Sequence, residues 1–262
     1  MLAPDLGGAG VLVTRPVHQA RGLCQAVSAA GGRPVTLPLL AVAGPLDADA
    51  TRAALVSALG DGLWLFTSPN AVRWTAQLAA AKPAAWPRQL AVAGHGTAAA
   101  LAGLGRTDAL CPAIDGAEGL LSLPVLDSLP GGATVTVLCG ARSPPRLADG
   151  LRRRGLQPRL IDVYRRVPVP HTAAEMAAAL EAVVAAIVTS GEGLQQLHAL
   201  TPAALQTRLM ALQLAVPSTR VVEMARRLGF QQLPLLPSRV GDEAFVQALL
   251  EWRTKQGKHA PR

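Results

Sequence analysis

The sequence predicts an α/β fold with two similar lobes, each built on a parallel sheet with helices on both faces. Strand-like and helix-like segments alternate along the chain at the spacing typical of βαβ units. The chain also repeats itself: LWLFTSPNAVRW and LAVAGHGTAAALAGLG within residues 63–105 correspond to IVTSGEGLQQL and LAVPSTRVVEMARRLG within residues 187–229. With 262 residues, half of them apolar, the chain can fill two hydrophobic cores.

Two further segments share one plan of strand, helix and strand. Near the start, a short buried strand leads into a helix that a pair of glycines ends, and a second strand follows. Residues 135–163 repeat that order, with Gly155 ending the helix. The predicted elements are the strand VLVTRP at 11–16, a helix over 17–30, the strand PVTLPLL at 34–40, the strand VTVLCG at 135–140, a helix over 146–154 and the strand RLIDVY at 159–164.

These segments can be assembled into lobes in two ways. In chain order the segments span 11–40, 63–126, 135–164 and 186–250. A tandem arrangement would cut the chain near residues 129–132. In a crossed arrangement the first segment pairs with the last and the second with the third, so that the chain passes between the lobes along 34–42 and 158–168. Periodicity alone does not distinguish the two.

Composition argues against several classes of protein. No uninterrupted apolar run reaches 18 residues, so a membrane span is not expected. The first residues, MLAPDLGGAG, lack a basic region, so a signal peptide is not expected either. The three cysteines are an odd number without metal-type spacing, which favours a reduced, cytoplasmic protein. The five histidines are scattered, so the sequence predicts no metal site.

The net charge of +8 comes almost entirely from arginine, because only three of the 25 basic residues are lysine. Arginine binds carboxylates and phosphates in a bidentate manner, so the excess suits an anionic ligand, although a solubilising surface explains it equally well. Nucleic acid is not an expected partner, because aromatic residues are only 3% of the chain and 152–154 is the single tight basic run. Neither a phosphate-binding loop of the G-x-x-x-x-G-K-[ST] type nor a G-x-S-x-G elbow is present.

Four polar turns follow predicted strands and precede helices. A Ser or Thr at such a turn commonly caps the helix, which stabilises it by about 1 kcal/mol. A helix N-terminus also offers free N–H groups and a positive dipole to an anion, and the two roles are compatible. The turns contain Thr67, Ser68 and Asn70; Gly94, Gly96 and Thr97; Thr189, Ser190 and Gly191; and Ser218, Thr219 and Arg220.

Tyr164 is the only tyrosine, and it comes at the end of a strand just before Arg165 and Arg166. It is either an amphipathic residue at a domain edge or a phenol that donates a proton in a cleft without a carboxylate pair.

The pattern as a whole resembles the uroporphyrinogen-III synthase family, from Val11 to about Leu250. Each piece is loose, but all of them occur in order at the family's spacing. The matching pieces are VLVTRP with Gln19 and Ala20, FTSPNAV (66–72), AVAGHGTAAAL (91–101), AEGLLSLP (117–124), LADGLRRRG (147–155), VYRR (163–166), VTSGEGLQQL (188–197) and PSTRVVEMARRLGF (217–230).

This resemblance implies two flavodoxin-like, parallel-sheet lobes joined by a two-stranded linker, with the active site in the inter-lobe cleft. It favours the crossed arrangement, with residues 1–37 and 168–262 in one lobe, 41–162 in the other, and linker strands near 34–42 and 158–168. The implied enzyme is a cyclising lyase of haem biosynthesis. It closes the linear tetrapyrrole hydroxymethylbilane, a polycarboxylate, to uroporphyrinogen III, with loss of water and inversion of ring D. The family implies no cofactor and no metal, a monomer, and a cytoplasmic location; transient contact with the preceding pathway enzyme is left open.

Carried over residue by residue, the resemblance makes Tyr164 the candidate acid for departure of the substrate hydroxyl. Arg15, in the TRP motif, either has a structural role or meets a carboxylate. The loop 139–144 departs from the family, because the two arginines usual there are missing and only Arg142 and Arg146 stand nearby. The remaining candidate substrate contacts are Thr67, Ser68, Asn70, Gly94, Thr97, Thr189, Ser190, Gly191, Ser218, Thr219 and Arg142.

Two alternatives keep the same fold without the reaction. One is a non-catalytic, two-lobed binding protein for a small anion, and the other is a degenerate homologue that binds an anionic tetrapyrrole without turnover. Analysis of the product isomers would separate both from the enzyme.

Overall fold

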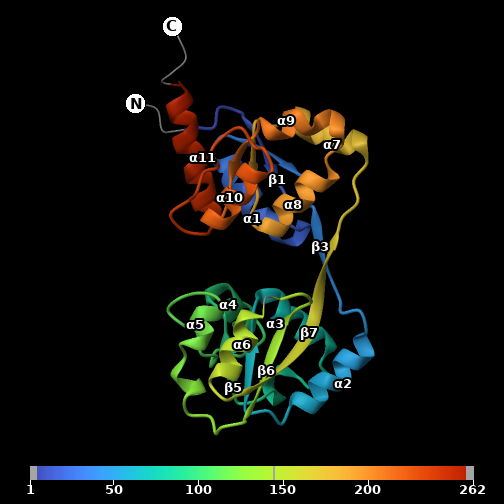
Figure 1. Ribbon diagram of the computed structural model, residues 1–262, viewed down its shortest axis with the longest axis vertical. Coiled ribbons are helices and arrows are strands. Elements are labelled where there is room, and N and C mark those ends of the chain that lie inside the picture. The colour runs from blue at the N-terminus through green and yellow to red at the C-terminus, as the bar shows by residue number, and fades with distance from the viewer. Residues whose placement is uncertain (1–4, 144, 258–262) are drawn as a thin grey trace. The chain divides into compact units, whose positions relative to one another are not determined.

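The computed structural model describes residues 5–143 and 145–257, and the chain divides into two compact α/β units. Unit 1 comprises residues 1–41 and 167–262, and unit 2 comprises residues 42–166. The blue start of the chain and its red end therefore belong to the same unit (Figure 1). The chain passes from one unit to the other twice, and the predicted α/β class with parallel sheets is confirmed.

Unit 1 contains a four-stranded sheet in the order β2-β1-β8-β9, and each neighbouring pair is parallel. Its strands are β1 (Gly10–Val13), β2 (Arg33–Thr36), β8 (Ala185–Ile187) and β9 (Gln213–Ala215). Its helices are α1 (Val17–Ala29), α7 (Ala173–Glu181), α8 (Gly191–Leu200), the 3₁₀ turn η3 (Ala203–Leu205), α9 (Gln206–Met210), α10 (Thr219–Arg227) and α11 (Asp242–Gly257).

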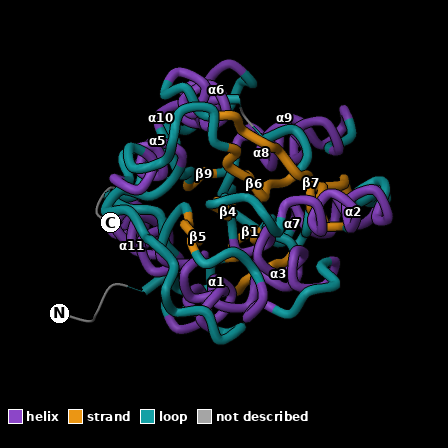
Figure 2. Tube along the Cα trace, turned by 90° about the horizontal axis from the view of Figure 1, so that it is seen from below, coloured by secondary structure: helices purple, strands orange, loops and turns teal. Residues whose placement is uncertain are grey.

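Helices cover the central strands of the unit 1 sheet on both faces. Successive residues of a strand point to opposite sides, so each central strand contributes to two apolar clusters. Leu12 belongs to an apolar cluster with residues of α7, α8 and α10, whereas Val11 and Val13 belong to a cluster with residues of α1 and α11. Figure 2 shows α1 and α11 on one side of β1, and α8 and α10 on the other. Ala186 and Ile187 divide between the same two clusters. The central strands β1 and β8 have the continuous apolar sequences typical of strands covered on both faces, whereas the edge strand β2 is partly exposed.

Unit 2 contains the sheet β3-β7-β6-β4-β5, in which β7-β6, β6-β4 and β4-β5 are parallel pairs. Its strands are β3 (Leu40–Ala43), β4 (Leu63–Phe66), β5 (Gln89–Val92), β6 (Thr134–Gly140) and β7 (Gln157–Pro168), the first and last of which extend across the unit boundary. Its helices are α2 (Ala48–Ala58), α3 (Pro69–Leu78), α4 (His95–Ala102), α5 (Ala117–Leu121) and α6 (Arg146–Arg153), with 3₁₀ turns η1 (Pro83–Ala85) and η2 (Pro124–Leu126).

The core of unit 2 follows the same alternation. Trp64 and Phe66 point to one face of β4, where Trp86 lies with its ring centroid 5.7 Å from each of theirs. Leu63 and Leu65 point to the other face, into a cluster with residues of α5 and α6. Both faces of this sheet are therefore covered by helices. A ligand could reach the sheet at the ends of its strands.

The prediction of a single strand over 34–40 is wrong. β2 ends at Thr36, and β3 begins only at Leu40. The backbone N–H groups of Leu37 and Leu39 still donate to the carbonyls of Val13 and Thr14, but Pro38 between them has no N–H to donate. The proline therefore divides one apolar run into two strands. Among the described residues, no helix is both long and apolar enough to cross a membrane.

Candidate active site

The polar turns predicted from the repeat all lie at the carboxyl ends of parallel strands. β4 leads through Ser68 into α3 and β5 through Gly94 into α4, while β8 leads through Ser190 into α8 and β9 through Ser218 into α10. In each unit, two polar turns thus place helix N-termini at this edge of the sheet, alongside α1 in unit 1 and α6 in unit 2. Open parallel sheets bind ligands at the carboxyl ends of their strands.

Ser68 and Ser190 occupy equivalent positions in the two units. The Ser68 hydroxyl accepts a hydrogen bond from the Ala71 N–H at 3.1 Å, and the Ser190 hydroxyl accepts one from the Gly193 N–H at 3.0 Å. The predicted capping role is therefore confirmed for both serines. Ser218 has the same extended backbone conformation, but its side chain makes no capping hydrogen bond.

Tyr164 lies within β7, which continues to Pro168, so the prediction that Tyr164 ends its strand is wrong. Its hydroxyl is 3.1 Å from the Ser68 hydroxyl. The side chain is buried, with 3% of its surface exposed, and the Arg166 guanidinium lies 6.0 Å from its ring centroid. A β-bulge between Cys139 and Gly140 pairs Gly140 with Tyr164. A Cβ at Gly140 would lie 2.6 Å from the Tyr164 ring carbon Cζ, so the absence of a side chain there lets the ring approach β6.

The other candidates of unit 2 differ in exposure. The Thr67 hydroxyl donates to the Leu138 carbonyl at 3.1 Å and so links β4 to β6. Asn70 is half-buried in the first turn of α3, whereas Thr97 is buried in the first turn of α4. Gly94 is buried, and a Cβ there would come within 2.4 Å of the Asp115 carboxylate. The Asp115 side chain is exposed and could move aside, so this close approach does not by itself require a glycine.

In unit 1, the N-termini of α8 and α10 lie beside each other. Gly191 is buried, and a Cβ at that position would lie 3.3 Å from Met224 Cε and 3.6 Å from Arg220 Nη2. The Arg220 guanidinium is therefore close to the first residue of α8, although Arg220 itself is the second residue of α10. Thr189 is half-buried, whereas Ser190 and Thr219 are exposed.

Arg220 is not among the substrate contacts that the family resemblance selects. Its position directly after Ser218 and Thr219 is the available signal in the sequence, because a cation in such a turn adds to the positive end of the helix dipole.

The three arginines near the predicted motifs have very different surroundings. Arg15 forms an ion pair with Asp242, the first residue of α11, at 2.5 Å, and both side chains are largely buried. This contact supports the structural alternative for Arg15. Arg142 is exposed and has φ of 63°, the only positive φ of a non-glycine residue in the described part of the chain. Arg146 pairs with Glu118 at 3.1 Å, and Pro144 of the same loop lies outside the described residues.

The Cys139 thiol, near the end of β6, is not a candidate nucleophile. Burial, and then the neighbouring Asp162 carboxylate, raises the pKa of the Cys139 thiol to about 12, so this thiol stays protonated and unreactive near neutral pH. Between 5 and 257, leaving out residue 144, the side chains of His, Cys, Asp and Glu form no group of three or more that could hold a metal ion.

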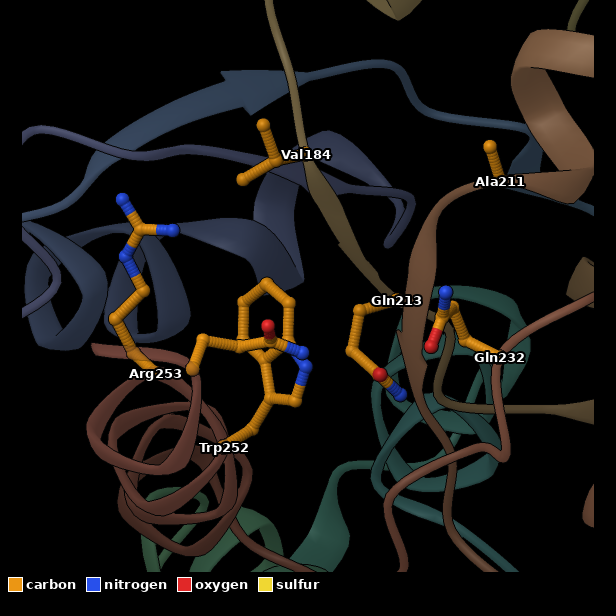
Figure 3. A pocket seen from close by; sticks show the side chains of 7 residues that line it. Val184, Ala211, Gln213, Gln232, Trp252 and Arg253 are labelled. Carbon is orange, nitrogen blue, oxygen red and sulfur yellow. The ribbon is translucent and has the colours of Figure 1, made fainter. Parts of the chain in front are cut away.

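A pocket of about 260 Å³ lies at the opposite edge of the unit 1 sheet, where Val184 precedes β8 and Gln213 begins β9. Figure 3 shows Gln213 across this pocket from Trp252 of α11. Because the polar turns follow the other ends of these strands, this pocket is separate from the candidate site.

The family model described as Uroporphyrinogen-III synthase HemD matches residues 22–247 of this chain. The chain is 31% identical to the uroporphyrinogen-III synthase of Escherichia coli strain K12 over 247 residues, which are 92% of this chain and 98% of that protein. It is 29% identical over 248 residues to the uroporphyrinogen-III synthase of Salmonella typhimurium, with the same coverage of both chains.

Two solved structures share the fold at low sequence identity. A mutant uroporphyrinogen III synthase from the extremely thermophilic bacterium Thermus thermophilus matches with a TM-score of 0.60 at 18% identity and covers 96% of this chain and 100% of that chain. The uroporphyrinogen-III synthetase of Helicobacter pylori 26695 matches with a TM-score of 0.60 at 14% identity, over 95% of this chain and 99% of that chain.

Proposed function

The chain belongs to the uroporphyrinogen-III synthase family, and we propose that it performs the family's reaction with Tyr164 and the polar turns of its two sheets. It is an enzyme of the cyclising lyase type that acts in tetrapyrrole biosynthesis. The reaction closes the linear tetrapyrrole hydroxymethylbilane to uroporphyrinogen III, with loss of water and inversion of the terminal ring.

The four helix N-termini would bind the carboxylates of the substrate. Each presents backbone N–H groups that no helical carbonyl accepts, together with the positive end of a helix dipole. The Ser218 hydroxyl, which makes no capping bond, and the neighbouring Arg220 guanidinium would add two side-chain donors. The proposed substrate contacts are Thr67, Asn70, Gly94, Thr97, Thr189, Ser190, Gly191, Ser218, Thr219, Arg142 and Arg220.

Tyr164 would act as the acid in the first chemical step. Its phenol donates a proton to the departing hydroxyl, the carbon–oxygen bond breaks, and water leaves behind an azafulvenium cation. The substituted carbon of the terminal pyrrole ring then attacks the exocyclic carbon of this cation to give a spiro intermediate, which fragments and recloses with the ring inverted. The proton released when the last ring regains aromaticity restores the phenol. Because Tyr164 is only 3% exposed, its neighbours must move aside for the substrate to reach its hydroxyl.

The selectivity of the reaction would come from fixing the substrate's conformation. Without an enzyme the linear chain closes directly to the type I isomer, so the protein must hold the terminal ring where attack at the substituted carbon is faster. The matched pair of helix N-termini in each unit supports this idea, because several fixed anion contacts restrain a flexible polycarboxylate better than one.

A coupled assay tests the proposed function. Hydroxymethylbilane is generated in situ, this protein is added, and the oxidised uroporphyrins are separated by chromatography. A dominant type III isomer is expected. If a folded sample gave only type I, the family's reaction would not be the activity of this chain, and a tetrapyrrole-binding role would take its place.

A further inference from the structure

The Ser68 hydroxyl joins the start of α3 to Tyr164. It accepts from the Ala71 N–H at 3.1 Å, and the Tyr164 hydroxyl lies 3.1 Å from the same oxygen. Ser190, its counterpart in unit 1, caps α8 in the same way, but Tyr164 is the only tyrosine of the chain, so no such pairing with a phenol exists there. Both units therefore have a serine that caps a helix at this position, but only the serine of unit 2 lies beside the phenol.

Proton counting limits what this pair can do. A serine hydroxyl has one proton to donate and two acceptor sites, and the Ala71 N–H occupies one of these sites. If Ser68 donates its proton to the Tyr164 oxygen, the phenol proton points elsewhere and is free for a ligand. If the phenol instead donates to Ser68, its proton is already engaged. When the phenol loses its proton, the first orientation becomes the favoured one, because a hydroxyl that donates to a phenolate forms a charge-assisted hydrogen bond.

Two further contacts hold the pair in place. The cap bond fixes the Ser68 oxygen relative to α3, and Gly140 leaves room for the Tyr164 ring against β6, where a Cβ would lie 2.9 Å from the phenol oxygen. The phenol oxygen thus lies between the Ser68 hydroxyl at the start of α3 and the backbone of β6.

We propose that Ser68 is a positioning residue for Tyr164: it directs the phenol proton toward the substrate and stabilises the phenolate left after proton transfer. This inference rests on the proposed role of Tyr164 as the acid. In the step concerned, the proton moves from Tyr164 to the departing hydroxyl, the carbon–oxygen bond breaks, water forms, and the negative charge remains on Tyr164 beside the Ser68 hydroxyl. Ser68 therefore acts through Tyr164.

The test is a double-mutant cycle of Ser68→Gly and Tyr164→Phe, with kcat and KM measured in the coupled assay. Glycine at an N-cap costs only a few tenths of a kcal/mol relative to serine, so Ser68→Gly removes the hydroxyl and leaves α3 intact. We expect Ser68→Gly to lower kcat about tenfold, which corresponds to about 1.4 kcal/mol of barrier, with KM changed less than about twofold. In the Tyr164→Phe background the same substitution should have no further effect on kcat. Ser68→Thr, which keeps the hydroxyl, should retain most of the wild-type kcat.

Asp47→Gly is the matched control. Asp47 caps α2 in the same unit by accepting a hydrogen bond from the Ala50 N–H at 2.8 Å. This substitution therefore removes a side-chain helix cap, as Ser68→Gly does, but leaves the surroundings of Tyr164 unchanged. Its kcat should equal that of the wild type.

Several outcomes would overturn the inference. It fails if Ser68→Gly slows Tyr164→Phe as much as it slows the wild type, because Ser68 would then act on the substrate or on the fold. It also fails if Tyr164→Phe itself has the wild-type kcat. Failure of the proposed function is distinct, because the wild-type protein would then yield only the type I isomer.

Discussion

Gly140 lies where any side chain would collide with Tyr164. Gly140→Ala would place a Cβ 2.6 Å from the Tyr164 ring, so either the ring or β6 must shift. We expect a loss of about 1–3 kcal/mol in the free energy of unfolding, and a kcat as low as that of Tyr164→Phe, because the phenol leaves its place beside Ser68. Gly131→Ala is the control, since a Cβ at Gly131 meets no atom within 4 Å. Wild-type kcat in folded Gly140→Ala would contradict this placement of the phenol.

The cysteines should differ sharply in reactivity. Burial raises the pKa of the Cys139 thiol to about 12, so at pH 7–8 almost none of it is the reactive thiolate, whereas Cys111 is exposed. With iodoacetamide at neutral pH, we expect peptide mass spectrometry to find Cys111 modified first and Cys139 unmodified until the protein is unfolded. Early modification of Cys139 in the native protein would show that its surroundings open more readily than the structure indicates.

At the residue scale, the sequence is most informative where the chemistry is local. Ser68 and Ser190 can be predicted as caps because each serine follows an apolar strand and precedes a helical pattern, although Ser218, in the same context, makes no capping hydrogen bond. The contact between Ser68 and Tyr164 could not be predicted, because the two residues are 96 positions apart and a β-bulge at Cys139 and Gly140 sets their alignment. The pairing of Arg15 with Asp242 could not be predicted either, because these residues are 227 positions apart.

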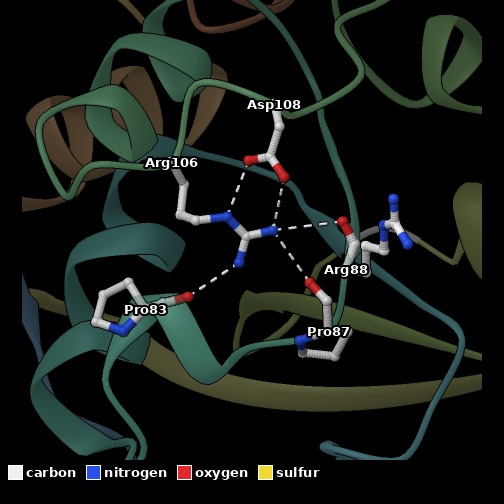
Figure 4. A network of polar contacts seen from close by, with 5 residues as sticks. All are labelled: Pro83, Pro87, Arg88, Arg106 and Asp108. Carbon is white, nitrogen blue, oxygen red and sulfur yellow. Dashed lines mark hydrogen bonds and ion pairs between the residues drawn. The ribbon is translucent and has the colours of Figure 1, made fainter.

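Among the connecting elements of unit 2, Arg106 holds the loop between α3 and β5 (Figure 4). Its guanidinium donates to the carbonyls of Pro83 and Pro87 at 2.9 and 3.1 Å, and it forms two hydrogen bonds with the Asp108 carboxylate at 2.8 and 3.0 Å. β5 begins directly after this loop and leads to the turn at Gly94. A side chain that follows α4 therefore fixes the entry to a site-bearing strand by binding backbone carbonyls of the preceding loop.

Arg106→Ala should destabilise the protein by about 1–3 kcal/mol, because it leaves two half-buried carbonyls without their donor. Chemical denaturation measures the difference. Asp108→Asn is the matched control: it preserves the carbonyl contacts and, since Asp108 is half-exposed, should cost less than about 1 kcal/mol. Equal losses in the two variants would show that the ion pair, and not the carbonyl contacts, carries the effect.

The contribution of Asp108 should also depend on pH. The hydrogen bond from Arg106 is the main cause that lowers the pKa of this carboxyl below its ordinary value of 3.8. A carboxyl whose pKa is lower in the folded protein than in the unfolded protein stabilises the fold at any pH above its unfolded-state pKa. This stabilisation is lost as the pH falls through the folded-state pKa. The difference in unfolding free energy between wild type and Asp108→Asn should therefore shrink as the pH falls below 3.8. A difference that grew with acidity would have the wrong sign.

At the scale of the whole molecule, residues 42–166 contain every member of two apolar clusters, one on each face of their sheet. We expect this fragment to unfold in a single cooperative transition in urea, followed by circular dichroism. The matched control is the fragment 1–128, which has β1 and β2 without β8 and β9, and β4 and β5 without β6 and β7. It should show no cooperative transition. The opposite result for the two fragments would mean that the sheets do not form independently as drawn.

The repeat in the sequence predicts the parallel α/β class, but local pattern cannot decide which segments share a sheet. That choice depends on the pairing of β1 with β8 and of β4 with β6, between strands far apart along the chain. The periodicity that identifies each strand is the same in both arrangements. It also fails to divide 34–40, where the single residue Pro38 interrupts an apolar run.

The central claim is that Tyr164 supplies the proton while the polar turns fix the conformation of the substrate. The most direct measurement is the rate and the isomer composition of the product formed by Tyr164→Phe. The account predicts a rate at least about a hundredfold lower, from loss of a general acid, with type III still the isomer formed by the enzyme. A wild-type rate would contradict the role of the phenol, and a fast reaction that gave type I would place conformational control in Tyr164 instead of in the turns.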